Sequence, residues 1–232
     1  AKRLSYAASF GKTNFDAATT GAYQQMLASY DKVTVREDSA VQMLESWGAK
    51  NCCGQVLDPT LLLNVDEWTD LLVDEEMQAK YASQKYILVY QIHNDKQLSS
   101  YALRLAVHTG LKLLRVNPFM HQARRGGKLV LCPDVTEFLS LIKNATYIVT
   151  DSFHGTCFSL IFEKQFIEIL PNNATGTRNQ SILTLTGLSD RIVTDFDDFN
   201  IINKNINYQP VREILTKERG RSIKMLKCLL DS

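Results

Sequence analysis

The residues whose types most clearly could carry out chemistry follow an apolar run of strand length, Thr146–Thr150, where the sequence becomes polar. Such runs are typical of strands buried on both faces, and a helix is predicted to begin around Thr156. Between them lie Asp151, Ser152, Phe153, His154 and Gly155. A helix N-terminus at the carboxyl edge of a parallel sheet offers N–H donors that suit phosphate or carboxylate groups. A histidine beside such a site can transfer protons.

A purely structural interpretation of this segment has equal support from the spacing alone. In it, Asp151 or Ser152 only caps the helix, and His154 is a turn residue whose hydrogen bonds are satisfied. Residue types alone do not decide between the two interpretations.

A second junction of a strand and a helix lies in Val33–Trp47. Asp38 or Ser39 is placed to cap the helix. Arg36 lies at the strand end, where a guanidinium group can hold an anion through two parallel hydrogen bonds. A surface arginine paired with Glu37 or Asp38 is the favoured interpretation if this junction is taken by itself.

The polar loop Pro171–Ser181 precedes a helix predicted over Gln180–Leu188. It carries Gly176 and Arg178, so it is the kind of loop that closes over a phosphate. Loops of this composition are common, and by itself this one is weak evidence.

Further polar residues end the apolar run Tyr86–Ile92. Tyr90, Gln91 and His93 should face the same crevice as the 151–155 segment, because parallel strands end at one edge of the sheet.

Two segments are given structural interpretations. The basic stretch Arg115–Lys128 is predicted to be a mobile solvated loop, although its charge could attract an acidic substrate. In Leu57–Leu63, Pro59 bends the chain after a strand, and Asp58 and Thr60 are predicted to be structural rather than catalytic.

Strand-length runs alternate with helical patterns along the chain, which predicts an α/β fold of βαβ units with parallel sheets. One predicted helix, Lys96–His108, ends at Gly110, and another, Asp134–Lys143, begins with a capping box formed by Asp134 and Glu137. The predicted strands are Leu4–Ala8, Lys32–Val35, Tyr86–Ile92, Leu111–Val116, Leu129–Cys132, Thr146–Thr150, Phe166–Leu170 and Arg191–Val193.

The composition is that of an ordinary globular protein, with 232 residues, 45% of them hydrophobic and 22% charged. A net charge of +1 argues against a general nucleic-acid binder. No apolar run approaches the ~18 residues of a membrane span. The five cysteines form no CxxC pair, and Cys132, Cys157 and Cys228 lie in apolar surroundings. We therefore expect buried structural thiols, no metal site and a cytoplasmic protein.

An acidic helical segment without a strand pattern divides the chain. The predicted parts are residues 1–63, the remnant of a first α/β domain; residues 64–81, a connector; residues 82–207, a complete α/β domain; and residues 208–232, a terminal helix. The first part has fewer strands than a sheet of this kind usually contains, so we expect that an upstream portion is missing.

Several motifs taken together resemble the polysaccharide pyruvyl transferase family. They are SYAASFG (Ser5–Gly11), VREDS (Val35–Ser39), LDPTLLL (Leu57–Leu63), EFLSLIKNATYIVTDSFHG (ending at Gly155) and the FSLIFEKQF that follows. The resemblance spans nearly the whole chain in the family's order. It implies two Rossmann-like halves arranged as in GT-B glycosyltransferases, with the active site in the cleft between them and the N-terminal half truncated.

The resemblance also implies an activity, the transfer of pyruvate from phosphoenolpyruvate to sugar hydroxyls. The product is usually a cyclic ketal, made in the biosynthesis of bacterial surface polysaccharides or exopolysaccharides. The donor carries a carboxylate and a phosphate, so it needs cationic partners. Its methylene carbon must be protonated, and a base must take the hydroxyl proton.

Site residues follow by match to the family's motifs. His154 would be the acid/base residue, and Arg36 would hold the donor's carboxylate or phosphate. Arg178 and the backbone amides of Ser152, Phe153 and Gly155 would share in donor binding, and Ser9, Tyr90, Gln91 and Asp151 are expected to line the cleft. The positive end of the helix dipole disfavours the cationic form of a histidine at a helix N-terminus. We therefore expect His154 to become protonated only when the negatively charged donor binds.

One position departs from the family pattern. That pattern reads Asp-Arg-x-His-Gly, and the arginine position is Ser152 in this chain. A hydroxyl group cannot replace a guanidinium group as an anion clamp. Either another cation substitutes, from Arg178 or from Arg115–Lys128, or the donor differs.

Two other functions stay open. One is a GT-B glycosyltransferase that uses a nucleotide sugar, in which Glu168 would bind the ribose. The other is a non-catalytic module for ligand binding or partner docking. The expected partners are phosphoenolpyruvate and a saccharide acceptor, which could be lipid-linked and so hold the cytoplasmic protein at the periphery of the inner membrane. No cofactor, metal or nucleic acid is expected.

Overall fold

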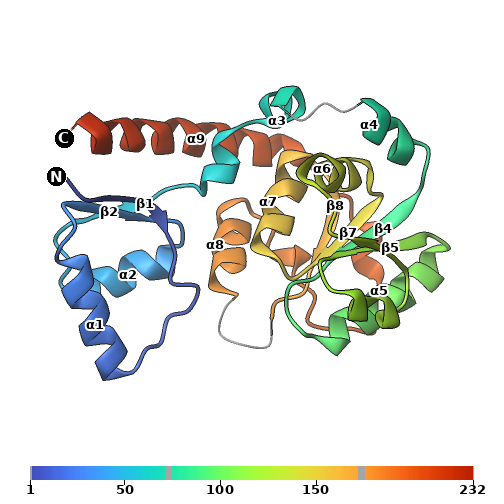
Figure 1. The fold of residues 1–232 in the computed structure, drawn as a ribbon, viewed down its shortest axis with the longest axis horizontal. Helices are drawn as coiled ribbons and strands as arrows, with labels where there is room; N and C mark the ends of the chain where they lie inside the picture. The colour runs from blue at the N-terminus through green and yellow to red at the C-terminus, as the bar shows by residue number, and fades with distance from the viewer. Residues whose placement is uncertain (1, 72–74, 172–175, 232) are drawn as a thin grey trace. The chain divides into compact units, whose positions relative to one another are not determined.

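The computed structural model describes residues 2–71, 75–171 and 176–231. The chain forms two compact units, each built from separate stretches of sequence (Figure 1). The first unit consists of Ala1–Leu62, Asn173–Leu188 and Gln209–Ser232, and the second of Leu63–Asn172 and Ser189–Tyr208. The linear division predicted from the sequence differs from this grouping, because it placed residues 173–188 in the second domain and made residues 208–232 a separate part.

The first unit contains a parallel sheet in the strand order β1-β2-β3. Val33 and Val35 of its middle strand pack against Ala40 and Leu44 of the helix that follows. The strands predicted over Leu4–Ala8 and Lys32–Val35 are confirmed. The third strand, β3, ends just before Leu57–Leu63, where the sequence predicted a strand end without giving its bounds. In chain order the elements are β1 (Leu4–Ala8), α1 (Ala17–Leu27), β2 (Lys32–Val35), α2 (Asp38–Ser46), β3 (Cys52–Gln55) and a 3₁₀ helix at Pro59–Leu62.

Two helices distant in sequence complete the first unit, α8 (Thr177–Leu185) and α9 (Tyr208–Asp231). Each helix contacts the N-terminal segment of the unit through a serine. In α8, Ser181 Oγ accepts the N–H of Asp38 at the start of α2, at 3.3 Å. In α9, the fully buried Ser222 Oγ accepts the N–H of Leu57, which follows β3, at 2.9 Å. α9 has 24 residues, but no helix in the described part of the chain is long and apolar enough to cross a membrane.

The second unit contains a parallel sheet in the order β6-β5-β4-β7-β8. The central strand, β4, is the continuous apolar run predicted to be buried, and its first four residues are 0% exposed. The elements are α3 (Val65–Leu71), α4 (Glu75–Ala82), β4 (Tyr86–Tyr90), α5 (Lys96–Thr109), β5 (Lys112–Asn117), a 3₁₀ helix at Met120–Arg125, β6 (Lys128–Leu131), α6 (Val135–Asn144), β7 (Tyr147–Thr150), α7 (Phe153–Ile161), β8 (Gln165–Glu168), and 3₁₀ helices at Ser189–Arg191 and Asn200–Asn203.

Helices cover both faces of this sheet (Figure 1). Alternate residues of a strand such as β4 face opposite sides of the sheet. On one face, Ile87 and Val89 join the core cluster that includes Leu98 and Leu105 of α5. On the other, the buried Tyr86 hydroxyl donates a hydrogen bond to the Leu141 carbonyl of α6 at 2.7 Å. The parallel α/β architecture predicted from the alternation of strands and helices is confirmed.

Two predicted helix ends are confirmed, with one difference. Gly110 ends α5 in the left-handed conformation, at a φ of 68°. Asp134 caps α6, where its carboxylate accepts the Glu137 N–H at 2.8 Å. In a capping box the Glu137 side chain would also accept the backbone N–H of Asp134. Here the Glu137 carboxylate instead pairs with Lys80 and accepts from the Tyr81 hydroxyl, both at 2.6 Å.

Two predictions about local structure are wrong. Arg191–Val193 is not a strand, since Ser189–Arg191 is a 3₁₀ helix and Ile192 forms a single bridge with Glu168. The basic stretch Arg115–Lys128 is not a mobile loop, because it begins inside β5 and continues as a 3₁₀ helix before β6.

The cysteines follow the prediction only in part. Cys157 in α7 is buried, as expected, but Cys132 and Cys228 are exposed. Apolar neighbours in the sequence did not predict burial here, since Leu131 and Leu230 are themselves 42% and 67% exposed. No disulfide is formed in the part of the chain that the structure describes.

Candidate functional site

Side-chain hydrogen bonds hold the link between β7 and α7. Ser152 is the N-cap of α7, and its Oγ accepts the Gly155 N–H at 3.3 Å. Thr150 Oγ1 donates to the Tyr90 carbonyl at 2.7 Å and accepts the Ser152 N–H at 3.0 Å. Ser152 is therefore a helix cap, and the Gly155 amide, expected to bind a ligand, donates to that cap.

Position 155 requires a glycine because α7 begins in close contact with the sheet. A Cβ atom at this position would overlap Thr150 Oγ1 and would lie 3.1 Å from Tyr90 Cδ1. The absence of a side chain allows the helix to start at the very end of β7. The start of the helix also fixes the backbone position of the preceding residue, His154, in the first turn of α7.

His154 lies in the first turn of α7 and is exposed, whereas Phe153 and Gly155 on either side of it are buried. Its ring meets the Phe153 ring edge-on, with the ring centroids 5.5 Å apart. The imidazole is thus accessible from outside the unit at the carboxyl edge of the sheet. This is the position that a proton-transfer residue requires.

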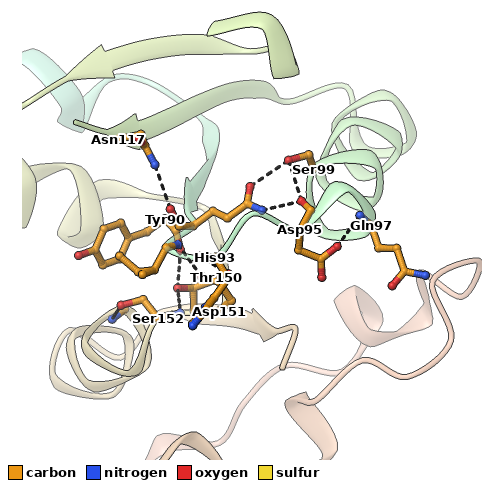
Figure 2. A network of polar contacts seen from close by, with 12 residues as sticks. Tyr90, His93, Asp95, Gln97, Ser99, Asn117, Thr150, Asp151 and Ser152 are labelled. Carbon is orange, nitrogen blue, oxygen red and sulfur yellow. Dashed lines mark hydrogen bonds and ion pairs between the residues drawn. The ribbon is translucent and has the colours of Figure 1, made fainter. Parts of the chain in front are cut away.

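Asp151 is 2% exposed, and it holds the loop that follows β4. Its two carboxylate oxygens accept the N–H groups of Ile92 at 2.7 Å and His93 at 2.9 Å (Figure 2). The His93 Nδ1 atom lies 3.2 Å from the same carboxylate. Burial raises the pKa of the Asp151 carboxyl, and the hydrogen bonds from the two backbone N–H groups offset part of that rise.

Gln91 fixes the same loop from its other side and is 1% exposed. Its Nε2 donates to the Asp95 carbonyl at 2.6 Å, and its Oε1 accepts from Ser99 Oγ at 2.9 Å and from Arg115 Nη1 at 3.1 Å. Figure 2 shows this network running from β4 to the start of α5. Gln91 is therefore a buried scaffold residue, whereas Tyr90 before it is half-buried.

In the first unit, Glu37 ties the loop after β1 to the start of α2. Its Oε1 accepts from Ser9 Oγ at 2.9 Å, the Phe10 N–H at 2.9 Å and the Gly11 N–H at 3.1 Å. Glu37 occupies the N-cap position of α2 but makes no side-chain cap bond, because its carboxylate is bound to this loop. The prediction that Asp38 or Ser39 caps the helix is wrong.

Arg36, at the end of β2, forms an ion pair with Asp58, which is 3% exposed. The expected alternative partners, Glu37 and Asp38, are not the ones used. Burial raises the pKa of Asp58, but hydrogen bonds from Thr60 and the hydrogen bond and charge of Arg36 outweigh it, so the pKa lies below its ordinary value. Asp58 is structural, as predicted, and its negative charge balances the cation that was expected to hold the donor.

Arg178 lies at the start of α8 and reaches the same loop as Ser9. A Cβ atom placed on Gly11 would lie 3.9 Å from Arg178 Nε and 4.0 Å from Nη2. Residues 172–175 of the predicted phosphate-binding loop lie outside the described residues. The first unit therefore brings Ser9, Arg36 and Arg178 to the carboxyl ends of β1 and β2.

Two other candidate residues are buried. Arg115 is 1% exposed, and burial and the nearby charge of Arg125 lower its pKa to about 10. Glu168, the candidate for binding a ribose, is 0% exposed, and its carboxylate accepts from the Thr156 hydroxyl at 2.6 Å. Both side chains therefore lie in the interior of the second unit.

The second unit brings the predicted residues Tyr90, Gln91 and 151–155 to the carboxyl ends of the neighbouring strands β4 and β7, whose register pairs Tyr90 with Thr150. Sequence reasoning missed the roles of Glu37, of Asp58 as the partner of Arg36, and of the contact between His93 and Asp151. The position of His93 just after a buried strand was a signal for the last of these. No spacing rule joins Arg36 to Asp58.

The fold and these sites define an α/β protein with parallel sheets flanked by helices and polar groups at the strand ends. Residues 1–173 match the family model described as polysaccharide pyruvyl transferase. The chain therefore belongs to the polysaccharide pyruvyl transferase family. The comparison with curated proteins gave no match.

Solved structures share the fold at low sequence identity. UDP-GlcNAc 2-epimerase from Neisseria meningitidis, bound to UDP-GlcNAc, has a TM-score of 0.63 and 11% identity, over 99% of this chain and 70% of its own. S. aureus MnaA in a co-structure with UDP has a TM-score of 0.57 and 16% identity, over 94% of this chain and 61% of its own. This likeness shows a fold like that of GT-B epimerases and glycosyltransferases, and the chain spans only about three fifths of the MnaA chain.

Proposed function

We propose that the protein transfers pyruvate from phosphoenolpyruvate to saccharide hydroxyls, forming a ketal, in the biosynthesis of a bacterial surface polysaccharide or exopolysaccharide. The observation that carries this proposal is the exposed His154, in the family's Asp-x-x-His-Gly pattern, at the first turn of α7. An accessible imidazole at the end of a buried strand suits proton transfer to and from small substrates.

The chemistry assigns roles to the residues of each unit. His154 would protonate the methylene carbon of the donor, which makes the neighbouring carbon, C2, electrophilic toward a sugar hydroxyl. The family's arginine next to this histidine is Ser152 here, and that serine caps α7. The candidates for binding the donor's carboxylate and phosphate are then Arg36 and Arg178, as the family resemblance implies.

The test measures phosphate release and pyruvylated product with the full-length protein, including any sequence that flanks residues 1–232. His154→Ala should lower kcat by about 10²–10⁴-fold, the usual contribution of a general acid or base. His108→Ala is the matched control, because His108 is an exposed histidine of the same unit that stacks on Phe199. A folded His154→Ala protein with full activity would remove this residue from the mechanism.

Calorimetry separates the proposal from the two other functions. Binding of phosphoenolpyruvate supports a pyruvyl transferase, and binding of UDP or GDP sugars instead would support a glycosyltransferase. Glu168, the residue expected to bind the ribose in that second enzyme, is 0% exposed. Heats of zero with every donor would favour a non-catalytic module.

A further inference from the structure

We propose that His93, oriented by Asp151, is a second catalytic residue and serves as the base that takes the proton of the acceptor hydroxyl. The proposal rests on the proposed function and adds a residue to it. It starts from a contact that joins the carboxyl ends of two neighbouring strands. His93 lies just after β4 and Asp151 just after β7, and Nδ1 of the imidazole is 3.2 Å from the Asp151 carboxylate (Figure 2).

The carboxylate determines which nitrogen of the ring carries the proton. Asp151 accepts the backbone N–H groups of Ile92 and His93, so it is held in place independently of the ring. A carboxylate can only accept, so Nδ1 must donate to it in the neutral ring. The basic nitrogen is then Nε2, on the opposite side of the ring from Asp151. This is the tautomer control that a buried aspartate exerts on a catalytic histidine in hydrolase triads.

A pair in which a carboxylate orients a catalytic histidine needs a buried carboxylate and an imidazole that a substrate can reach. The Asp151 side chain is 1% exposed, whereas the His93 side chain is 31% exposed. The buried partner thus orients the ring, and the ring reaches the surface. A histidine is not needed to hold this loop, because the two backbone N–H groups already bind the carboxylate. The contact of the His93 side chain with Asp151 is thus an addition to the two backbone hydrogen bonds that hold the loop.

The assigned step can be written so that atoms and protons balance. His154 gives a proton to the donor's methylene carbon, which becomes a methyl group. The oxygen of a first hydroxyl bonds to C2 as His93 Nε2 takes its proton. The bond from C2 to the phosphate oxygen then breaks, and phosphate leaves with the electron pair and the proton from His93. A second hydroxyl completes the ketal at C2, and its proton restores His154.

The decisive variant is His93→Asn in the full-length protein. The Asn Nδ2 atom can donate to Asp151 as the imidazole Nδ1 does, but the side chain has no basic nitrogen. We expect kcat to fall by about 10²–10⁴-fold in both His93→Asn and His93→Ala. The acidic limb of the pH–rate profile should disappear in both, because a base must lose its proton before it can act. The KM for phosphoenolpyruvate should change little, and His108→Asn should behave like the wild type.

Asp151→Asn tests the orienting group, since it should lower kcat while leaving the KM for phosphoenolpyruvate nearly unchanged. ¹⁵N NMR of the wild-type imidazole gives a readout that does not depend on activity, with the proton expected on Nδ1 in the neutral ring. A proton on Nε2 would overturn the proposal. An active His93→Asn variant beside an inactive His93→Ala would reduce His93 to a loop contact. A wild-type protein that transfers no pyruvate would overturn the proposed function itself, and this step with it.

Discussion

The two units present polar residues at the same place, the carboxyl ends of parallel strands, but they balance charge in different ways. In the first unit a cation, Arg36, is paired with the buried carboxylate of Asp58. In the second unit the buried carboxylate of Asp151 is held by backbone N–H groups and faces the imidazole of His93. The first arrangement pairs a cation with a carboxylate, whereas the second places a carboxylate beside an imidazole.

This difference suggests a division of labour. A guanidinium group does not lose its proton in proteins, so it suits the binding of an anion and not proton transfer. An imidazole can both accept and donate a proton, so His93 and His154 are the residues proposed for proton transfer. The proposed roles thus differ between the units although the topology is the same, a strand followed by a polar turn and a helix.

The largest expected effect on stability comes from breaking the ion pair of the first unit. Arg36→Met should lower the free energy of unfolding by about 3–5 kcal/mol, because it leaves the Asp58 carboxylate buried without its counter-charge. Urea unfolding at neutral pH measures this. The double variant Arg36→Met with Asp58→Leu should recover much of the loss, and a double variant as unstable as the single one would contradict the explanation.

In the second unit, Gly155→Ala should cost about 1–3 kcal/mol through overpacking against Thr150 and Tyr90. The matched control is Gly21→Ala in α1, where an added Cβ atom meets nothing within 4 Å. That substitution should instead stabilise the protein by about 0.5–1 kcal/mol, since alanine favours helices over glycine. Thermal unfolding of the two variants should shift in opposite directions. Equal shifts would mean that the close approach at position 155 is not what selects glycine.

A smaller effect is expected at the cap of α7. Ser152→Ala removes the acceptor of the Gly155 N–H and should cost about 1 kcal/mol, the usual value for a helix N-cap. Ser152→Asp, which keeps an acceptor at the cap, should retain most of the stability. Circular dichroism with chemical unfolding measures both. If the alanine variant is as stable as the wild type, Ser152 is free for another role, and binding of the donor becomes the first to test.

The contributions of the two buried aspartates, Asp58 and Asp151, to the free energy of unfolding should change with pH in opposite directions. The pKa of Asp58 is lowered on folding, so its contribution is present above the unfolded value of about 3.9 and is lost as the pH falls through the lowered pKa. The pKa of Asp151 is raised, so its contribution is present below about 3.9 and is lost as the pH rises through the raised pKa.

Asp58→Asn and Asp151→Asn, unfolded in urea between about pH 3 and 7, test this sign difference. The stability that the wild type has over Asp58→Asn should grow with pH, and the stability it has over Asp151→Asn should shrink. Two curves with the same slope would show that the carboxylates are not in the different environments described above.

Much of the fold followed from local patterns. β1 and β2 end where the apolar runs end, and Gly110 and Asp134 mark helix ends, because caps and strand burial are decided within a few residues of sequence. The candidate strand Arg191–Val193 failed for the opposite reason. A short apolar stretch becomes a strand only if a sheet edge is available along its whole length, and here one bridge forms.

The candidate site shows the same limit. The types of Arg36, His154 and Asp151, and their places after strands, were visible in the sequence. The partners were not: Asp58 lies 22 residues from Arg36, and Asp151 lies 58 residues from His93. Pattern rules report spacings of a few residues, so they do not show which distant carboxylate balances a given charge.

The sequence by itself determined the α/β class, the family motifs and the residue types at the strand ends, because these depend on local periodicity and composition. The tertiary structure decided which of those side chains are buried and what each one contacts. Burial and pairing change the pKa and accessibility of a group, and they arise only when segments distant in the chain pack together. For that reason only the tertiary structure shows that Asp151 contacts His93, that Asp58 pairs with Arg36, and that Glu168 is buried.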